Sequence, residues 1–166
     1  MKNRKRNSNK ANTPCITYLE RAGVSYTMHS YTHDEGNSSY GLEAAERLDV
    51  EADRIFKSLV VEVDESQLLV CIIPVTHRLS MKAVAKAHGA KKAQMADKSL
   101  VQRTTGYVLG GVSPIGQKIT LPTYIDESAI LYESILVSGG MRGIDIELKV
   151  DDLQLITQAR YISLVV

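Results

Sequence analysis

Apolar residues recur along this chain with two periods, and each period predicts its own kind of element. Apolar positions that alternate with polar ones, and short apolar runs, predict β-strands. Apolar positions three and four apart, flanked by capping residues, predict α-helices. Strands are expected at residues 24–31, 55–63, 67–73, 91–95, 121–125, 134–137, 144–148 and 161–166. Helices are expected at 14–22, 40–48, 81–87, 98–103 and 150–157, with a short helical turn from Asp126.

The order of these elements predicts the fold class. Strands and helices are mixed without a regular β-α-β repeat, which favours an α+β fold with a mixed β-sheet core and surrounding helices. The polar turn at 64–66 separates two apolar strands and predicts a hairpin. No internal repeat interrupts residues 13–166, which we expect to form a single domain.

Charge divides the chain into a tail and a domain. Five of the 20 basic residues lie within residues 1–12, a polar stretch that we expect to be a disordered basic tail. The rest of the chain carries 15 basic and 19 acidic residues, a net charge of −4. Such a domain is not basic over a whole face, so we expect its contact with a polyanion to be small and local, and we expect no DNA partner.

The remaining bulk features narrow the class of protein. No apolar run approaches the roughly 18 residues that span a membrane, so we expect no membrane partner and a cytoplasmic location. Cys15 and Cys71 lie far apart among apolar neighbours and are expected to be reduced core residues. The four histidines match no metal-ligand spacing, so we expect neither a metal nor a cofactor.

Two glycine-rich stretches are candidates for a ligand site. The first covers residues 103–118 and the second covers residues 137–143; each contains a Gly-Gly pair. Paired glycines let the backbone approach a ligand closely, and they are also common in plain turns. On sequence alone, the two stretches either line one pocket or form two tight turns.

Lys57 is the most informative single residue. Strand alternation places it on the same face as Leu59 and Val61, and an unpaired ammonium is costly to bury there. It either reaches water from the end of the strand or stands at a pocket wall, where it binds a phosphate or polarises a carbonyl. Asp145 alternates with two isoleucines and points either into the same pocket or to solvent.

Three separated motifs resemble those of the YbaK family of bacterial aminoacyl-tRNA deacylases. They are Phe-Lys-Ser-Leu at 56–59, the glycine-rich stretch at 105–116, and Val-Ser-Gly-Gly-Met-Arg-Gly at 137–143. Their order and spacing agree with the family from about residue 13 to residue 161. Relatives in this family include the editing domain of bacterial prolyl-tRNA synthetase and free-standing alanyl-tRNA(Pro) deacylases.

The resemblance implies the residues of a site. The catalytic residues it implies are Lys57, Gly110 and Ser138, and the substrate-binding residues are Tyr31, Tyr40, Ser58, Gly111, Gly140 and Asp145. Lys57 is expected to help hold the 3′-terminal nucleotide. Three positions depart from the family pattern: Tyr40 replaces a common phenylalanine, Ser58 replaces threonine, and Met141 replaces lysine. These departures bear on affinity and substrate preference more than on the chemistry.

The resemblance also implies an activity, trans-editing of Cys-tRNA(Pro), in which the substrate's own thiol attacks the ester. The expected partners are the acceptor end of tRNA(Pro) carrying cysteine and prolyl-tRNA synthetase. One alternative is a deacylase for Ala-tRNA(Pro) or for a broader set of esters. Another is a non-catalytic module that docks on the synthetase or on tRNA.

Overall fold

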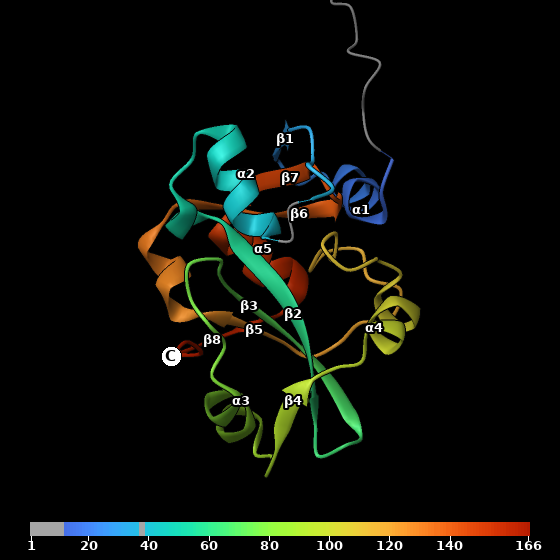
Figure 1. Ribbon diagram of the computed structural model, residues 1–166, viewed down its shortest axis with the longest axis vertical. Coiled ribbons are helices and arrows are strands. Elements are labelled where there is room, and N and C mark those ends of the chain that lie inside the picture. Colours follow the sequence, from blue (N-terminus) through green and yellow to red (C-terminus); the bar gives the residue numbers. More distant parts are fainter. Residues whose placement is uncertain (1–11, 37–38) are drawn as a thin grey trace, which may run out of the picture.

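The computed structural model describes residues 12–36 and 39–166. All of the expected basic tail except Asn12 lies outside the described residues. The described chain folds into two β-sheets with helices around them, as Figure 1 shows. This arrangement confirms the predicted α+β class.

The larger sheet has five strands in the order β4-β2-β3-β5-β8. Their bounds are β2 Phe56–Val63, β3 Gln67–Pro74, β4 Ala93–Met95, β5 Thr123–Asp126 and β8 Arg160–Ile162. The β2–β3 pair is the predicted antiparallel hairpin, with Lys57 opposite Ile73. Strand β5 pairs in parallel with β3, and β8 pairs in parallel with β5, so this sheet is mixed.

The smaller sheet has three antiparallel strands in the order β1-β7-β6. Their bounds are β1 Thr27–Ser30, β6 Ser134–Met141 and β7 Ile144–Lys149. A single parallel bridge between Ile55 and Leu136 joins the two sheets next to the start of β2. The strand that carries Lys57 therefore begins where the sheets meet.

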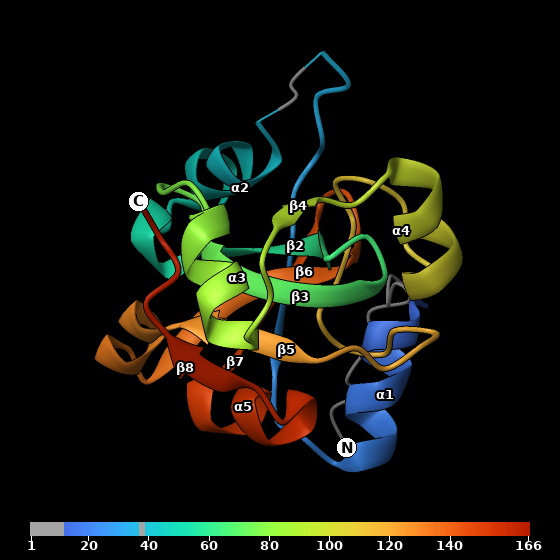
Figure 2. The same cartoon turned by 90° about the horizontal axis from the view of Figure 1, so that it is seen from below.

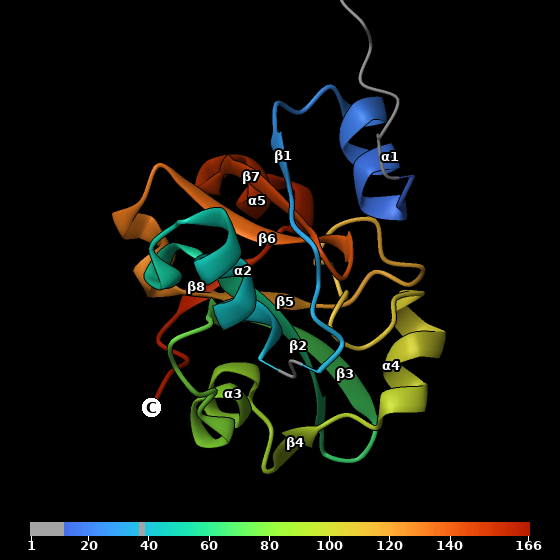
Figure 3. The same cartoon turned by 45° about the horizontal axis from the view of Figure 1, so that its top comes forward.

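The five predicted helices all form, and three of them begin at a residue whose side chain caps the helix. Their bounds are α1 Pro14–Ala22, α2 Tyr40–Leu48, α3 Met81–His88, α4 Lys98–Thr105 and α5 Val150–Thr157, with 3-10 turns η1 Ala52–Arg54 and η2 Glu127–Leu131. The side chains of Thr13, Ser80 and Asp97 accept N–H groups at the starts of α1, α3 and α4. Figures 2 and 3 show how α1, α3 and α4 are spread around the sheets.

Both faces of the larger sheet are covered. Phe56, Val60 and Ile72 pack with residues of the smaller sheet, α1 and α5 in the main core. Val61 and Val84 belong to a second cluster on the other face, under α3. Each large apolar side chain buried this way contributes roughly 1.5–3 kcal/mol. The two cysteines are buried and unpaired, as predicted, and burial raises the pKa values of Cys15 and Cys71 to about 11 and about 12.

Three segments differ from the predictions. In the second glycine-rich stretch, the Gly-Gly pair is not in the turn: Gly139 and Gly140 lie inside β6, which pairs with β7 through an irregularity between Ser138 and Met141, and the turn follows at Arg142 and Gly143. The first glycine-rich stretch begins in α4, which extends to Thr105. Strands β1 and β8 are shorter than the alternating patterns suggested, because pairing partners are available for only part of each pattern.

Candidate functional site

A cavity of about 430 Å³ opens between α2, the first residues of β2, the loop around Gly110, and the β6–β7 pair. Seven of the nine predicted site residues line it: Tyr31, Tyr40, Lys57, Ser58, Gly110, Ser138 and Asp145. Gly111 and Gly140 are not among the lining residues. The two glycine-rich stretches thus meet at one cavity, which decides against two unrelated turns.

Lys57 is half-buried at the cavity wall. Burial lowers the pKa of its ammonium, and the positive charge of Arg78 lowers it further. Among the described residues, no side chain or carbonyl forms a hydrogen bond or ion pair with this ammonium. The pocket-wall alternative from the sequence therefore fits the geometry, and the ammonium has its donors available for a ligand.

Ser58 follows Lys57 and also faces the cavity. Its hydroxyl oxygen is buried, and no hydrogen-bond partner for it exists in the described part of the chain. Most buried hydroxyl groups in folded proteins are paired. An unpaired hydroxyl at a cavity wall is a group for which a ligand can supply the partner.

Asp145 is the acidic group of the cavity. It is buried, and burial raises the pKa of its carboxyl to about 7. No cation or hydrogen-bond donor among the described residues offsets that burial. Its negative charge in turn helps to raise the pKa of Tyr31 to about 12, after the larger effect of burial. The carboxyl is poised to ionise when a cationic ligand enters.

Gly110 holds the loop close to two side chains. Its φ is +85°, and a Cβ there would lie 2.7 Å from Arg142 Nε and 2.8 Å from the Tyr40 ring. Arg142 donates to the Leu109 carbonyl from Nε and from one terminal nitrogen, and its guanidinium lies 4.8 Å from the centre of the Tyr40 ring. This clamp fixes the glycine-rich loop against α2.

Gly111 and Gly140 support the cavity from behind. A Cβ at Gly111 would lie 2.9 Å from Met141 Cα, so only glycine lets the loop lie directly on β6. The Gly140 N–H donates to Ser138 Oγ at 3.1 Å. That hydrogen bond orients Ser138, and direct contact of Gly140 with the substrate stays a prediction.

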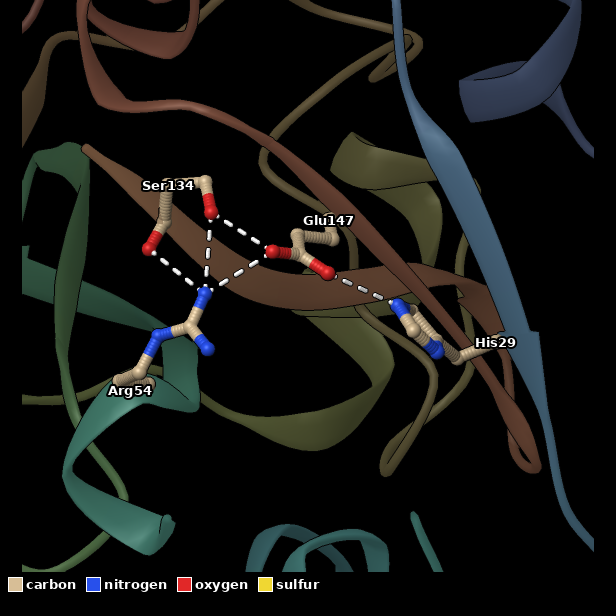
Figure 4. A network of polar contacts seen from close by, with 4 residues as sticks. All are labelled: His29, Arg54, Ser134 and Glu147. Atoms are coloured by element: carbon tan, nitrogen blue, oxygen red, sulfur yellow. Dashed lines mark hydrogen bonds and ion pairs between the residues drawn. The ribbon is translucent and has the colours of Figure 1, made fainter. Parts of the chain in front are cut away.

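The histidines are engaged in other contacts. His33 Nδ1 lies 2.6 Å from a carboxylate oxygen of buried Glu43, and this hydrogen bond lowers the pKa of Glu43. His29 joins Arg54 and Ser134 around Glu147 (Figure 4). Within residues 12–36 and 39–166, no three His, Cys, Asp or Glu side chains converge as metal ligands would. In the same residues, no helix is long and apolar enough to cross a membrane.

Sequence reasoning missed Arg142 and Arg78. Arg142 lies within the second motif, but its role depends on contact with a loop 33 residues earlier in the chain. Arg78 carries no motif at all. The only signal for either residue is a basic side chain close to a glycine pair or close to the end of an apolar strand.

Comparison with known proteins gives a consistent result. A family model described as the aminoacyl-tRNA editing domain matches residues 37–156. An Enterococcus faecalis protein named "Putative Cys-tRNA(Pro)/Cys-tRNA(Cys) deacylase EbsC" is 37% identical over 149 residues, which cover 90% of either chain. A proline–tRNA ligase of Shouchella clausii is 38% identical over 84 residues, covering 51% of this chain and 14% of the ligase.

Solved structures agree on the fold. One described as a "putative trans-editing enzyme for prolyl tRNA synthetase" matches with a TM-score of 0.78 at 22% identity, over 95% of this chain and 99% of that chain. The predicted resemblance is thereby confirmed, and with it the prediction of an enzyme. This chain belongs to the aminoacyl-tRNA editing domain family, and it is an aminoacyl-tRNA deacylase.

Proposed function

We propose that this protein clears cysteine from mischarged tRNA(Pro), and that the substrate's thiol performs the attack. One observation carries the proposal: among the described residues, the cavity offers an ammonium, a hydroxyl and a carboxyl that have no protein partner, and it offers no hydrogen-bonded pair of nucleophile and base. The name of the Enterococcus relative supports the choice of a cysteinyl ester. The two cysteines of the chain are buried and keep their protons, so they do not compete as nucleophiles.

The reaction replaces the carbon–oxygen bond of the ester with a carbon–sulfur bond. The cysteinyl sulfur attacks the ester carbonyl carbon of its own residue, and a carbon–sulfur bond forms as the bond to the terminal ribose oxygen breaks. The ribose oxygen leaves with the proton that the thiol has lost. The products are a tRNA with a free terminal hydroxyl and a cyclic thiolactone, which water then opens to cysteine. In favourable cases, holding the two reacting groups in the right orientation lowers the activation barrier by roughly 7–11 kcal/mol.

The cavity groups bind the substrate at its two charged ends. Lys57 holds a phosphate of the 3′-terminal nucleotide as a point charge. Asp145 receives the α-ammonium of the amino acid, whose positive charge lowers the carboxyl pKa from about 7 and ionises it on binding. Ser58 and Ser138 hydrogen-bond the ester region from adjoining strands. This arrangement bends the aminoacyl group so that its sulfur reaches its own carbonyl carbon.

Selection of the tRNA is proposed to come from a partner. The domain outside the tail has a net charge of −4, so it neutralises few phosphates and discriminates poorly among tRNAs by itself. A complex with prolyl-tRNA synthetase, in the cytoplasm where charging occurs, would present tRNA(Pro). A strong preference of the isolated protein for tRNA(Pro) over other cysteinylated tRNAs would contradict this part.

The test compares three esters on the same tRNA(Pro): cysteinyl, S-methylcysteinyl and alanyl. We expect rapid loss of the cysteinyl ester only, with a thiolactone released before free cysteine, as followed by mass spectrometry. Loss of all three at similar rates would show water attack and a broader deacylase. Binding of tRNA without loss of any ester would overturn the catalytic proposal and favour the non-catalytic module.

A further inference from the structure

One segment of the domain contains five of its 15 basic residues and no acidic residue. Residues 75–96 contain five lysines and arginines and no aspartate or glutamate, whereas the domain outside this segment has 10 basic and 19 acidic residues. The five are Arg78, Lys82, Lys86, Lys91 and Lys92. All five are exposed, and none forms an ion pair within the described residues. This is the small, local site of polyanion contact that the overall charge allows.

Three of these residues, Arg78, Lys82 and Lys86, recur every four positions in the sequence and are together called the row. Lys82 and Lys86 lie four residues apart on α3 and so share one exposed face, while Val84 and Ala85 bury the opposite face. Arg78 lies four residues before Lys82, in the connection from β3. Its carbonyl accepts the Val166 N–H at 3.0 Å, which holds this part of the connection in place.

The row continues from the cavity. The connection between β3 and α3 runs along the sheet from the end near α2 down to α3, as the light-green segment of Figure 1 shows. Arg78 is close enough to Lys57 for its charge to lower the pKa of the Lys57 ammonium. A chain of phosphates that begins at Lys57 therefore meets Arg78 next and then the exposed face of α3.

The far end of the segment is less suited to an anion. Lys82, Lys86, Lys91 and Lys92 all line one groove, which they share with the carboxylates of Glu62, Asp64 and Glu65. Asp64 is in direct contact with the last two lysines, because its carboxylate accepts their backbone N–H groups. Arg78 does not line this groove, so the end of the segment near the cavity carries its positive charge away from these carboxylates.

We propose that Arg78, Lys82 and Lys86 form a basic track that binds the phosphate backbone of the RNA acceptor arm whose 3′ end enters the cavity. The inference rests on the proposed function, because it takes the RNA end to be held at Lys57. The track adds affinity without base recognition, since lysine and arginine contacts to phosphate carry no sequence information. It also sets the direction in which the arm leaves the site.

The test measures binding of an RNA hairpin that carries an uncharged acceptor stem and its single-stranded 3′ end. The variant Lys82→Glu/Lys86→Glu reverses two charges on the exposed face of α3, away from the cavity. The matched control is Lys118→Glu/Lys149→Glu, which reverses two exposed charges elsewhere. We expect the α3 variant to bind on the order of tenfold more weakly, and the slope of log affinity against log salt to fall by about two. The control should change neither by as much.

Other variants and partners sharpen the outcome. Lys91→Glu/Lys92→Glu should have a smaller effect than the α3 variant, because the Asp64 carboxylate is in direct contact with the backbone of Lys91 and Lys92. If the α3 variant had the same RNA affinity and the same salt dependence as the wild type, the proposed basic track would be wrong. Loss of binding to prolyl-tRNA synthetase with RNA affinity intact would also overturn it and make α3 a protein-docking face. Because the hairpin carries no ester, its binding does not depend on deacylation. The basic track can therefore be confirmed even if the wild type shows no deacylase activity.

Discussion

Two carboxylates of β7 stand two residues apart on the same face of the strand, yet their surroundings are opposite. Glu147 accepts hydrogen bonds from Ser134 and Arg54 and contacts His29 (Figure 4), and these contacts lower its pKa to about 2. Asp145 has no such partner among the described residues, and burial raises its pKa to about 7. One strand therefore carries a satisfied structural carboxylate and an unsatisfied one at a cavity.

The contrast indicates how this fold separates stability from function. Around Glu147, the charges satisfy one another and hold η1, β1 and β6 together. Around Asp145, the groups keep unmet hydrogen-bonding capacity, which costs stability and can be recovered only when a ligand binds. Within the described residues, an ammonium, a hydroxyl and a carboxyl that are at least partly buried and have no partner, those of Lys57, Ser58 and Asp145, lie together at the cavity, and this is the physical basis for placing the reaction there.

The largest effect is expected from Asp145→Asn. The carboxyl pKa is higher in the folded protein than in the unfolded chain, where it is near 3.9, so folded protein loses stability as the pH rises from about 4 to about 7. The amide does not ionise, and it should stabilise the protein by on the order of 3 kcal/mol at pH 8 and by almost nothing near pH 4. Urea unfolding at the two pH values measures this. If the substitution changed the free energy of unfolding equally at pH 4 and pH 8, Asp145 would not be an unpaired carboxylate in the folded protein. Deacylation should be impaired.

Glu147→Ala should act in the opposite direction. It leaves Arg54, Ser134 and His29 without their shared partner and should destabilise the protein by about 2 kcal/mol at pH 7. The pKa of Glu147 is lowered on folding, so its contribution is present above about pH 4 and is lost as the pH falls toward 2. The thermal unfolding temperatures of the variant and of the wild type should converge as the pH falls toward 2. A variant as stable as the wild type at pH 7 would show that the network contributes nothing.

Alanine substitutions of the two cavity serines should have smaller effects on the free energy of unfolding, and these effects should differ from each other. Ser138 Oγ accepts the Gly140 N–H, so Ser138→Ala should cost about 1 kcal/mol in the free energy of unfolding. Ser58→Ala removes a hydroxyl that has no partner and should change stability by less than about 0.5 kcal/mol. Both should weaken turnover. If Ser58→Ala destabilised the protein more than Ser138→Ala, the hydroxyl would have a partner in the folded state.

The sequence predicted most of the fold because its signals are local. Capping residues and apolar periodicity predict α1 with its observed bounds, and apolar periodicity alone predicts α2 and α5 with theirs. The sequence predicts that β6 ends at Val137, because Gly-Gly usually marks a turn; only pairing with β7 shows that the strand continues to Met141. Such pairing depends on residues that local patterns do not connect.

The candidate site divides in the same way. Lys57 stood out because an ammonium on an apolar strand face is anomalous on sequence alone. The unpaired state of Asp145 and the pairing of Glu147 were not predictable, since Arg54 reaches Glu147 across 93 residues of chain. The clamp at Arg142 likewise requires α2, β6 and the glycine-rich loop to meet, which no single motif encodes.

The cavity groups without protein partners are proposed to act on the substrate, and Lys57 is the first of them to remove. Single-turnover deacylation of Cys-tRNA(Pro) should be measured for Lys57→Ala, with Lys149→Ala as the matched loss of an exposed lysine. We expect the rate of Lys57→Ala to be on the order of 10²–10³-fold lower, comparable to loss of one electrostatic contact to the reacting group or its anchor, and the rate of Lys149→Ala to equal that of the wild type. Deacylation by Lys57→Ala at the wild-type rate would show that Lys57 does not act on the substrate.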